Sequence, residues 1–342
     1  MGSFALPKSA TGFRIAPESQ LDLRPESDIV SELCSFRPVA SEKNVGAFWN
    51  KGLDRMDWFP DCFVNRTMNG SHAGQHSADL VRLPLLFEHG GIWMDVGNML
   101  HTHLDRLFWE PLTAADSPYE MGVWIISGQI RKQWGSFGNY MLAARKGCMF
   151  IKDWHNCYKG LWKDRTNADS FHKLPLVQDI GLAEGMADWN FQDKIRKMSG
   201  YVAHMLIADR TRNLLDTSTG WNGRDFFENK VFMVEFFTTL LDEPDTEKRQ
   251  TTEDFVIEIP EKSQRYKVYR NSAGGLPALG DLVKKEGSRD ADHRLGTFGE
   301  MYRYGTVHWE STCGVERLRP QPTGEELIRA TPTEPGSFPA EL

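Results

Sequence analysis

The chain carries the run HSADLVRLPLLFEHGGIWMDVGN, from His76 to Asn98, which predicts a helix, a glycine turn and a short strand in that order. Ser77 has a side chain that can cap a helix, so we expect the helix to begin there. The pair Gly90-Gly91 can end the helix because glycine adopts the left-handed conformation at little cost. The apolar residues Ile92–Met94 then predict a buried strand that ends at Asp95.

Two charged side chains of this helix, Asp79 and Arg82, are three positions apart and therefore share one helix face. Near a helix N-terminus the backbone N–H groups and the helix dipole favour an anion. Together with Asp95 the run offers an acid, a base and a second acid. Each of these features is common in structural roles, as a capping acid, an ion pair or a strand-end acid. Their combination around a glycine turn favours a ligand site.

The pattern Ala78-Asp79-Leu80-Val81-Arg82, followed by Gly90-Gly91-Ile92-Trp93-Met94-Asp95, resembles the core of the capsular polysaccharide synthesis protein family, in its fungal branch, close to glycosyltransferase family 32. The thirteen positions from Arg82 to Asp95 are also the spacing of related sugar-transferring toxins. The resemblance covers roughly residues 45–312. It implies an α/β fold, with a GT-A-like (Rossmann-like) mixed sheet, flanking helices and a helical insertion.

The resemblance also implies roles for single residues. The Asp and Arg that match Asp79 and Arg82 hold hydroxyls of the donor sugar, and the acidic motif that matches Asp95 holds ribose, diphosphate and a divalent metal, Mn²⁺ or Mg²⁺. His308 lies in a segment similar to the histidine-containing end of family 32 domains, which returns to the metal and diphosphate. Imidazole can ligate a divalent ion or donate to phosphate, although a structural role for His308 remains the alternative. Ser311 is a further candidate for phosphate binding.

The acidic motif departs from the family at one point. The family usually has Asp-x-Asp, whereas this chain has Asp95-Val96-Gly97. A hard divalent cation needs several oxygen ligands, so the missing carboxylate should weaken a metal site.

Composition sets limits on the class of protein. The 342 residues are 40% hydrophobic, with 20 Phe and 11 Trp, which suits one large domain with a substantial core. The net charge of −7 and the absence of a Lys/Arg block disfavour nucleic acid as a partner. Five scattered cysteines, an odd number, favour a reducing compartment. No apolar run of about 18 residues and no leader is visible, so we expect a cytoplasmic protein without a membrane span.

The chain is expected to divide into an N-terminal arm at 1–43, a GT-A-like domain at 44–312 with a helical insertion at about 148–295, and a C-terminal tail at 313–342. The arm should be poorly ordered or extended. Only about a dozen residues separate the first expected strand from the segment at Cys62, which indicates a shortened nucleotide-binding half. Strands are expected at 45–49, 122–127 and 140–144, and helical segments at 104–109, 150–162, 203–215, 226–241 and 297–305.

Two further groups of residues leave alternatives open. The aromatic residues between Phe150 and Trp162 recur at helical spacing, which favours a core face over an aromatic ligand cage. His72 and His76 stand at the entrance to the key helix. They could line the cleft or serve in packing, and the sequence does not separate the two.

The predicted function is transfer of a sugar, of hexosyltransferase type, from a nucleotide-sugar donor to a small-molecule or glycan acceptor, with retention at the anomeric carbon as family 32 implies. A function of a different class is the alternative to glycosyl transfer. The motif Asp95-Val96-Gly97 and the shortened first half would also suit a GT-A-like scaffold repurposed as a cyclase or a binding protein of fungal secondary metabolism. The sequence does not set the oligomeric state.

Overall fold

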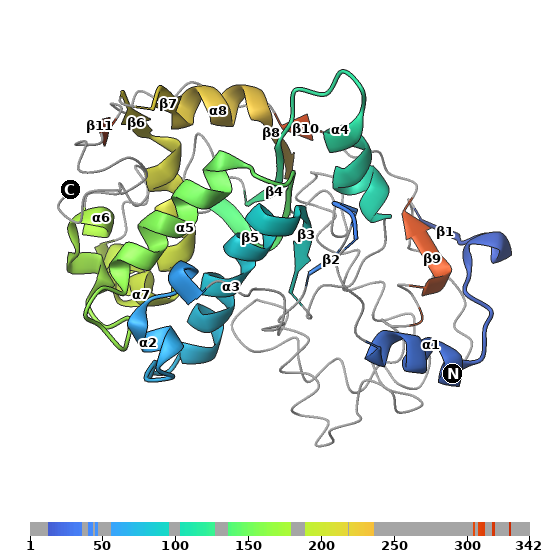
Figure 1. The fold of residues 1–342 in the computed structure, drawn as a ribbon, viewed down its shortest axis with the longest axis horizontal. Helices are drawn as coiled ribbons and strands as arrows, with labels where there is room; N and C mark the ends of the chain where they lie inside the picture. Colours follow the sequence, from blue (N-terminus) through green and yellow to red (C-terminus); the bar gives the residue numbers. More distant parts are fainter. Residues whose placement is uncertain are drawn as a thin grey trace. The chain divides into compact units, whose positions relative to one another are not determined.

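The computed structural model describes residues 13–35, 40–43, 45–46, 56–95, 103–126, 136–178, 189–217, 219–235, 304, 307–311, 317–318 and 328–329 (Figure 1). These residues fall into two compact units. The smaller unit takes its described residues from 13–35, 103–107, 304 and 307–311. The larger unit holds the rest, including the run from His76 to Asp95.

A six-stranded mixed sheet forms the centre of the larger unit, with the strand order β10-β8-β4-β5-β3-β2. β5 runs antiparallel to both of its neighbours, β3 and β4, whereas β2 is parallel to β3 and β8 is parallel to β4. The expected α/β class with a mixed sheet is therefore confirmed. The strands are β2 (Val45–Gly46), β3 (Gly91–Met94), β4 (Met121–Ile126), β5 (Ser136–Ala144), β8 (Val231–Glu235) and β10 (Arg317–Leu318).

The helix before β3 is longer than the sequence predicted. α3 spans Ala73–His89, so Ser77 is not its cap but lies inside it, where its hydroxyl donates to the carbonyl of Ala73 at 2.7 Å. The helix starts earlier because backbone bonding begins with the N–H of His76, which donates to the carbonyl of His72 at 3.0 Å. Asp79 is therefore not in the first turn, and the expected support from the helix N-terminus is wrong for it.

The predicted glycine turn after α3 is confirmed. Gly90 has a φ of 67° and Gly91 a φ of 100°, and the N–H of Gly90 closes the helix on the carbonyl of Leu86 at 2.8 Å. A Cβ atom on Gly90 would lie 2.8 Å from the backbone nitrogen of Lys146. Both the backbone angle and the close approach require glycine here. The turn sends the chain directly into β3.

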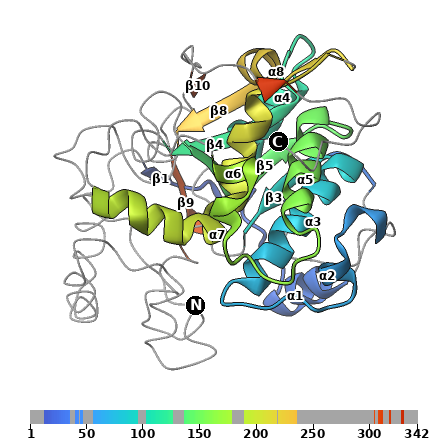
Figure 2. The same cartoon turned by 90° about the vertical axis from the view of Figure 1, so that its left-hand side faces the viewer.

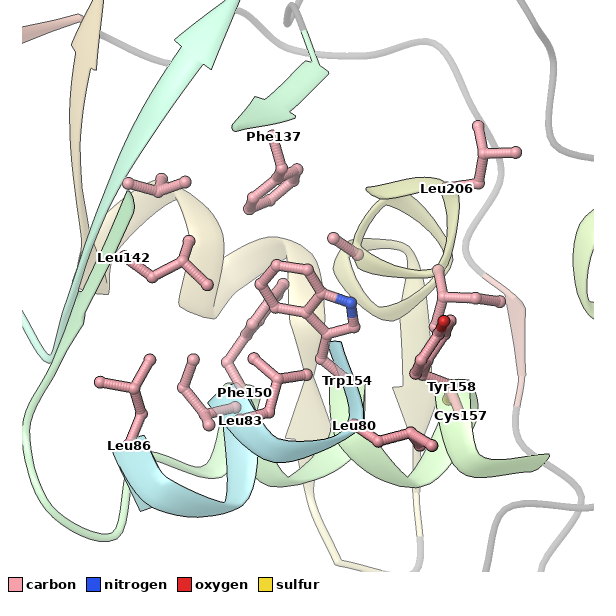
Figure 3. Packing of buried hydrophobic residues seen from close by; sticks show 14 of the residues in the cluster. Leu80, Leu83, Leu86, Phe137, Leu142, Phe150, Trp154, Cys157, Tyr158 and Leu206 are labelled. Carbon is pink, nitrogen blue, oxygen red and sulfur yellow. The ribbon is translucent and has the colours of Figure 1, made fainter. Parts of the chain in front are cut away.

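α3 and α5 (Met149–Leu161) lie side by side along the sheet (Figure 2). Leu80, Leu83 and Leu86 of α3 lie in one cluster with Phe150 and Trp154 of α5, and Phe137 and Leu142 of β5 belong to the same cluster (Figure 3). All seven side chains are at most 3% exposed, and burial of each such side chain stabilises the fold by roughly 1.5–3 kcal/mol. The core reading of the aromatic stretch is confirmed.

The stretch after residue 214 differs from the expected helices. The helix expected at 226–241 ends at Lys230, and residues 231–235 form β8 instead, because Val231–Val234 is a continuous buried apolar run that pairs with β4. Residues 236–241 lie outside the described residues. The elements here are α7 (Trp189–Arg212), β6 (Leu214–Asp216), β7 (Trp221–Asn222), α8 (Gly223–Lys230) and β11 (Ile328–Arg329), the three strands forming a small second sheet.

The smaller unit contains structure that the sequence did not predict. β1 (Phe13–Ile15) pairs antiparallel with β9 (Trp309–Ser311), and α1 spans Glu26–Cys34. The expectation of a poorly ordered or merely extended arm is wrong for these residues. Arg14 on β1 contacts Glu310 on β9 at 2.7 Å, which joins chain segments that are almost 300 residues apart. The expected helix at 297–305 lies outside the described residues except for Tyr304.

Shorter elements complete the description. The helical segment expected at 104–109 is present as the π-helical turn η3 (Asp105–Trp109), which continues into α4 (Glu110–Thr113). Among the helices described, none is both long enough and apolar enough to cross a membrane. The remaining short helices are η1 (Glu18–Gln20), η2 (Met56–Trp58), α2 (Asp61–Val64), η4 (Phe171–Lys173) and α6 (Pro175–Gln178).

Candidate functional site

The structure places the carboxylates of Asp79 and Asp95 beside the guanidinium group of Arg82. Arg82 Nη2 lies 3.0 Å from Asp79 Oδ1 and 3.6 Å from Asp95 Oδ1. Asp79 and Arg82 come from α3, and Asp95 follows β3 directly, its N–H donating to the carbonyl of Tyr140 at 2.9 Å. Because the chain reverses at Gly90, the first half of the helix lies beside the carboxyl end of the strand. The three residues therefore lie together, and their role in holding a donor stays a prediction.

Burial differs within this group. Asp79 and Arg82 are each only 3% exposed, whereas the side chain of Asp95 is 40% exposed. Arg82 Nη1 also donates to the backbone carbonyl of Asn139, and its guanidinium lies over the ring of Trp93, 5.2 Å from the ring centroid. Asp95 is thus the part of the group that solvent reaches, and Arg82 is held behind it.

The charge state of Asp79 follows from its neighbours. Burial raises the pKa of this carboxyl group, but the nearby Arg82 and His76 lower it further, and the net pKa lies below the ordinary value of 3.8. Asp79 is therefore an anion at neutral pH. A buried anion beside a buried guanidinium forms a charge-assisted contact with a fixed geometry.

Asp95 has the opposite balance. Partial burial raises its pKa above 3.8, and this effect outweighs the lowering by Arg82 and by Trp93. The indole N–H of Trp93 donates to Asp95 Oδ1 at 2.7 Å. Residues i and i+2 of a strand lie on the same face, which explains why the two side chains meet. The carboxylate is therefore oriented by two neighbours.

Four residues surround Asp79: His76, which the sequence left open as a cleft residue, and three that were not predicted as site residues, Asn139, Tyr158 and His204. Asn139 on β5 donates from Nδ2 to Asp79 Oδ1 at 3.1 Å, and the same nitrogen lies 3.2 Å from Nδ1 of His204 on α7. The Tyr158 hydroxyl on α5 donates to Asp79 Oδ2 at 3.5 Å and lies 2.9 Å from His76 Nδ1. Four elements, α3, β5, α5 and α7, thus contribute a side chain to this network.

The sequence contained only weak signals for these residues. Asn139 is a polar residue inside an otherwise apolar strand, and Tyr158 belongs to the aromatic face of α5. Either could have been chosen as a partner of Asp79, but 60 and 79 positions separate them from it. Of the two histidines at the helix entrance, His76 is 2% exposed and belongs to this network, whereas His72 is exposed, and a role of either at a cleft stays a prediction.

The described residues do not make up a site for a divalent metal. Within them, no group of three or more His, Cys, Asp or Glu side chains is arranged to hold a metal ion. Asp95 could offer one carboxylate, but its Oδ1 already accepts from Trp93 and faces Arg82. Asp79, the other acid of the group, is buried in its own ion pair. A hard cation needs more oxygen ligands than this arrangement supplies.

His308 and Ser311 belong to the smaller unit, so their predicted role at a diphosphate stays a prediction. The His308 side chain has a clear local role. Its Nδ1–H donates to the carbonyl of Tyr304 at 2.9 Å, because a carbonyl can only accept, and its ring stacks on Tyr304 with centroids 3.8 Å apart. Ser311 lies in β9, opposite Phe13 of β1.

Comparison with known proteins identifies the family. The family described as capsular polysaccharide synthesis protein matches residues 34–214. The O-glycosyltransferase braB of Annulohypoxylon truncatum is 30% identical, over 95% of this chain and 93% of the relative. The glycosyltransferase afumC of Aspergillus fumigatus is 29% identical, over 96% of this chain and 99% of the relative. The O-glycosyltransferase PaGT of Phomopsis amygdali is 27% identical, over 97% of this chain and 98% of the relative. No solved structure matches the chain.

The matched region contains all of α3, the glycine turn and β3, and hence Asp79, Arg82 and Asp95. The resemblance seen in the sequence is confirmed, and the chain belongs to the capsular polysaccharide synthesis protein family.

Proposed function

We propose that this chain is a glycosyltransferase that transfers a sugar, of hexosyl type, from a nucleotide-sugar donor to a small-molecule or glycan acceptor. Its relatives from fungi are named glycosyltransferases, and they match over nearly the full length of this chain. The observation that carries the proposal is the guanidinium of Arg82, which lies between the buried Asp79 and the part-exposed Asp95 at the carboxyl end of β3. Ligands of open α/β sheets bind beyond the carboxyl ends of the strands.

Asp95 makes the first contact with the donor in this proposal. An ionised carboxylate only accepts hydrogen bonds, so it suits a hydroxyl of the sugar or the ribose and repels the diphosphate. Arg82 reduces that repulsion because its positive charge lies 3.6 Å behind Asp95. Asp79 holds Arg82 in place, and through Arg82 and Asp95 the pair orients the sugar.

The transfer step needs orientation of the sugar and stabilisation of the charge that develops on the departing diphosphate. The chain's own contribution in the described residues is orientation, through Asp95, Arg82 and Asp79. The described residues do not fit a divalent metal, so no step is assigned to one. Retention at the anomeric carbon is part of the proposal, and NMR of the anomeric proton in the first-formed product tests it.

Calorimetric titration tests the proposal. The probes are UDP-glucose, UDP-galactose, UDP-N-acetylglucosamine and GDP-mannose, each with and without Mn²⁺. We expect saturable binding of at least one probe, weakened about tenfold or more by Asp95→Asn, because the lost charge removes a charge-assisted hydrogen bond worth about 1.5–3 kcal/mol. Asp116→Asn is the matched control, since Asp116 is an exposed carboxylate in a turn of the same unit.

Two outcomes would contradict the proposal. If the wild-type protein binds none of the probes in either condition, a scaffold without sugar-nucleotide chemistry explains the fold better. If a probe binds and Asp95→Asn binds it as tightly as Asp116→Asn does, the donor lies away from the carboxyl end of β3.

A further inference from the structure

Asn139 contacts both members of the buried ion pair. Its backbone carbonyl accepts from Arg82 Nη1, and its side-chain Nδ2 donates to Asp79 Oδ1 at 3.1 Å. The orientation of the amide follows from chemistry. Asp79 is ionised and can only accept, so Asn139 must present its NH₂ group, and not its oxygen, to the carboxylate.

The orientation of Asn139 fixes the proton on His204. The same amide nitrogen lies 3.2 Å from His204 Nδ1, and since the amide nitrogen can only donate, Nδ1 must be the acceptor. His204 is therefore neutral and carries its proton on Nε2. Burial agrees with this, because the residue is 0% exposed and burial lowers its pKa to about 3.

The imidazole of His204 is itself held in place. The indole N–H of Trp154 donates to the backbone carbonyl of His204 at 2.8 Å, and the Trp154 ring lies against the imidazole with centroids 4.5 Å apart. The ring of Tyr158 packs perpendicular to the imidazole, with ring centroids 4.7 Å apart. Among the described residues Nε2 is buried and finds no acceptor. The contact at Nδ1 thus decides the tautomer. A proton on Nδ1 would face the NH₂ group of Asn139, so the proton lies on Nε2.

On the basis of the function proposed above, we infer that His204 is a positioning residue for the Asp79–Arg82 pair. The lone pair on Nδ1 keeps the Asn139 amide turned so that its NH₂ group faces Asp79. Without an acceptor at this position the second N–H of the amide is buried with no partner, and the side chain is no longer held at the orientation that points its first N–H at Asp79. Asp79 would lose one of the two short contacts to Oδ1, and Arg82 would lose its fixed counter-ion.

Kinetics with the nucleotide sugar that the wild-type protein binds provide the first test. His204→Leu removes the acceptor and should lower kcat/KM by about tenfold to a hundredfold, the size expected for misplaced catalytic groups. His204→Asn places an amide oxygen near the position of Nδ1 and should keep kcat/KM within about threefold of wild type. Retained kcat/KM in His204→Leu would overturn the inference.

His155→Leu is the matched control. His155 is also a fully buried histidine, but its Nε2 bonds to the carbonyl of Trp58 at 2.7 Å and not to Asn139 or Asp79. Its loss should lower stability and leave kcat/KM unchanged. An equal fall in kcat/KM in the two leucine variants would show that His204 acts through general packing, which would also overturn the inference.

NMR of the protein without donor provides a test that does not depend on turnover. In ¹⁵N-histidine-labelled protein, His204 should show an unprotonated Nδ1 and a protonated Nε2, unchanged from pH 5 to pH 8. In ¹⁵N-asparagine-labelled protein, the Asn139 amide signals should move in His204→Leu and return in His204→Asn. A proton on Nδ1, or unmoved Asn139 signals, would overturn the inference. If these NMR results hold and no nucleotide sugar binds, the proposed function fails while the positioning of Asp79 stands.

Discussion

Asp79 is the residue on which the buried network converges. Its Oδ1 atom lies 3.0 Å from Arg82 Nη2 and accepts from Asn139 at 3.1 Å, and its Oδ2 atom accepts from Tyr158 at 3.5 Å. A carboxylate inside a core needs such partners because burial alone favours its neutral form. The network keeps Asp79 charged, Asp79 holds Arg82, and Arg82 in turn acts on Asp95.

The same residues predict how stability depends on pH. His204 stays neutral in the folded protein down to about pH 3, whereas in the unfolded chain it takes up a proton below its ordinary pKa of 6.5. Between these values the unfolded state binds more protons, so the free energy of unfolding falls as the pH is lowered, by about 1.4 kcal/mol per pH unit. This contribution to stability is fully present above pH 6.5.

His204→Asn removes that titration and allows the slope to be measured. Urea unfolding of wild type and variant at pH 7, 6 and 5 should show that the advantage of wild type shrinks by about 1.4 kcal/mol per unit below pH 6.5. His155, whose pKa burial lowers to about 4, remains in both proteins and cancels from the difference. A difference that stays constant from pH 7 to pH 5 would contradict the prediction.

At the scale of elements, α3, the glycine turn and β3 form the unit that positions the site. The sequence predicted the turn, the strand and the shared face of Asp79 and Arg82, because these depend on local spacing. It placed the start of α3 wrongly, because Ser77 looks like a cap but the helix bonding already begins at His72. It could not predict Asn139 as a partner, because the pairing of β5 with β3 depends on the whole sheet.

The glycine turn provides a prediction at this scale. Gly90→Ala should lower the free energy of unfolding by about 2–4 kcal/mol, because a Cβ at a φ of 67° is strained by about 1–2 kcal/mol and would also meet the backbone of Lys146 at 2.8 Å. Gly147→Ala is the matched control. Gly147 also has a positive φ, 78°, but nothing lies within 4 Å of the position that a methyl group would take there.

The two glycine variants separate strain from steric clash. Gly147→Ala should lose only the strain, about 1–2 kcal/mol, and urea unfolding measures both losses. Because the turn sets the distance between α3 and β3, Gly90→Ala should also weaken donor binding, whereas Gly147→Ala should not. Equal losses of stability in the two variants would show that the close approach to Lys146 contributes nothing.

At the scale of the whole molecule, the site is an extension of the core of the larger unit. α3, α5 and α7 supply the leucines and aromatic side chains of the core, and the same helices supply His76, Tyr158 and His204 to the network. A buried ion pair is usually a poor source of stability compared with apolar residues of similar volume. The pair lies beside the apolar core and behind the part-exposed Asp95, which fits a role in function.

Replacing one or both members of the pair tests this interpretation by global unfolding. Arg82→Met should lower the free energy of unfolding by about 3–5 kcal/mol, because it leaves the charge of Asp79 buried without its main counter-ion. The double variant Asp79→Asn, Arg82→Met carries no buried charge, so it should recover most of that loss while donor binding and turnover stay abolished. For the double variant, urea unfolding should therefore show recovered stability, while calorimetry with the probe that wild type binds should show no binding. If the double variant unfolds as easily as Arg82→Met, the pair holds the fold together, and its position beside Asp95 needs no functional explanation.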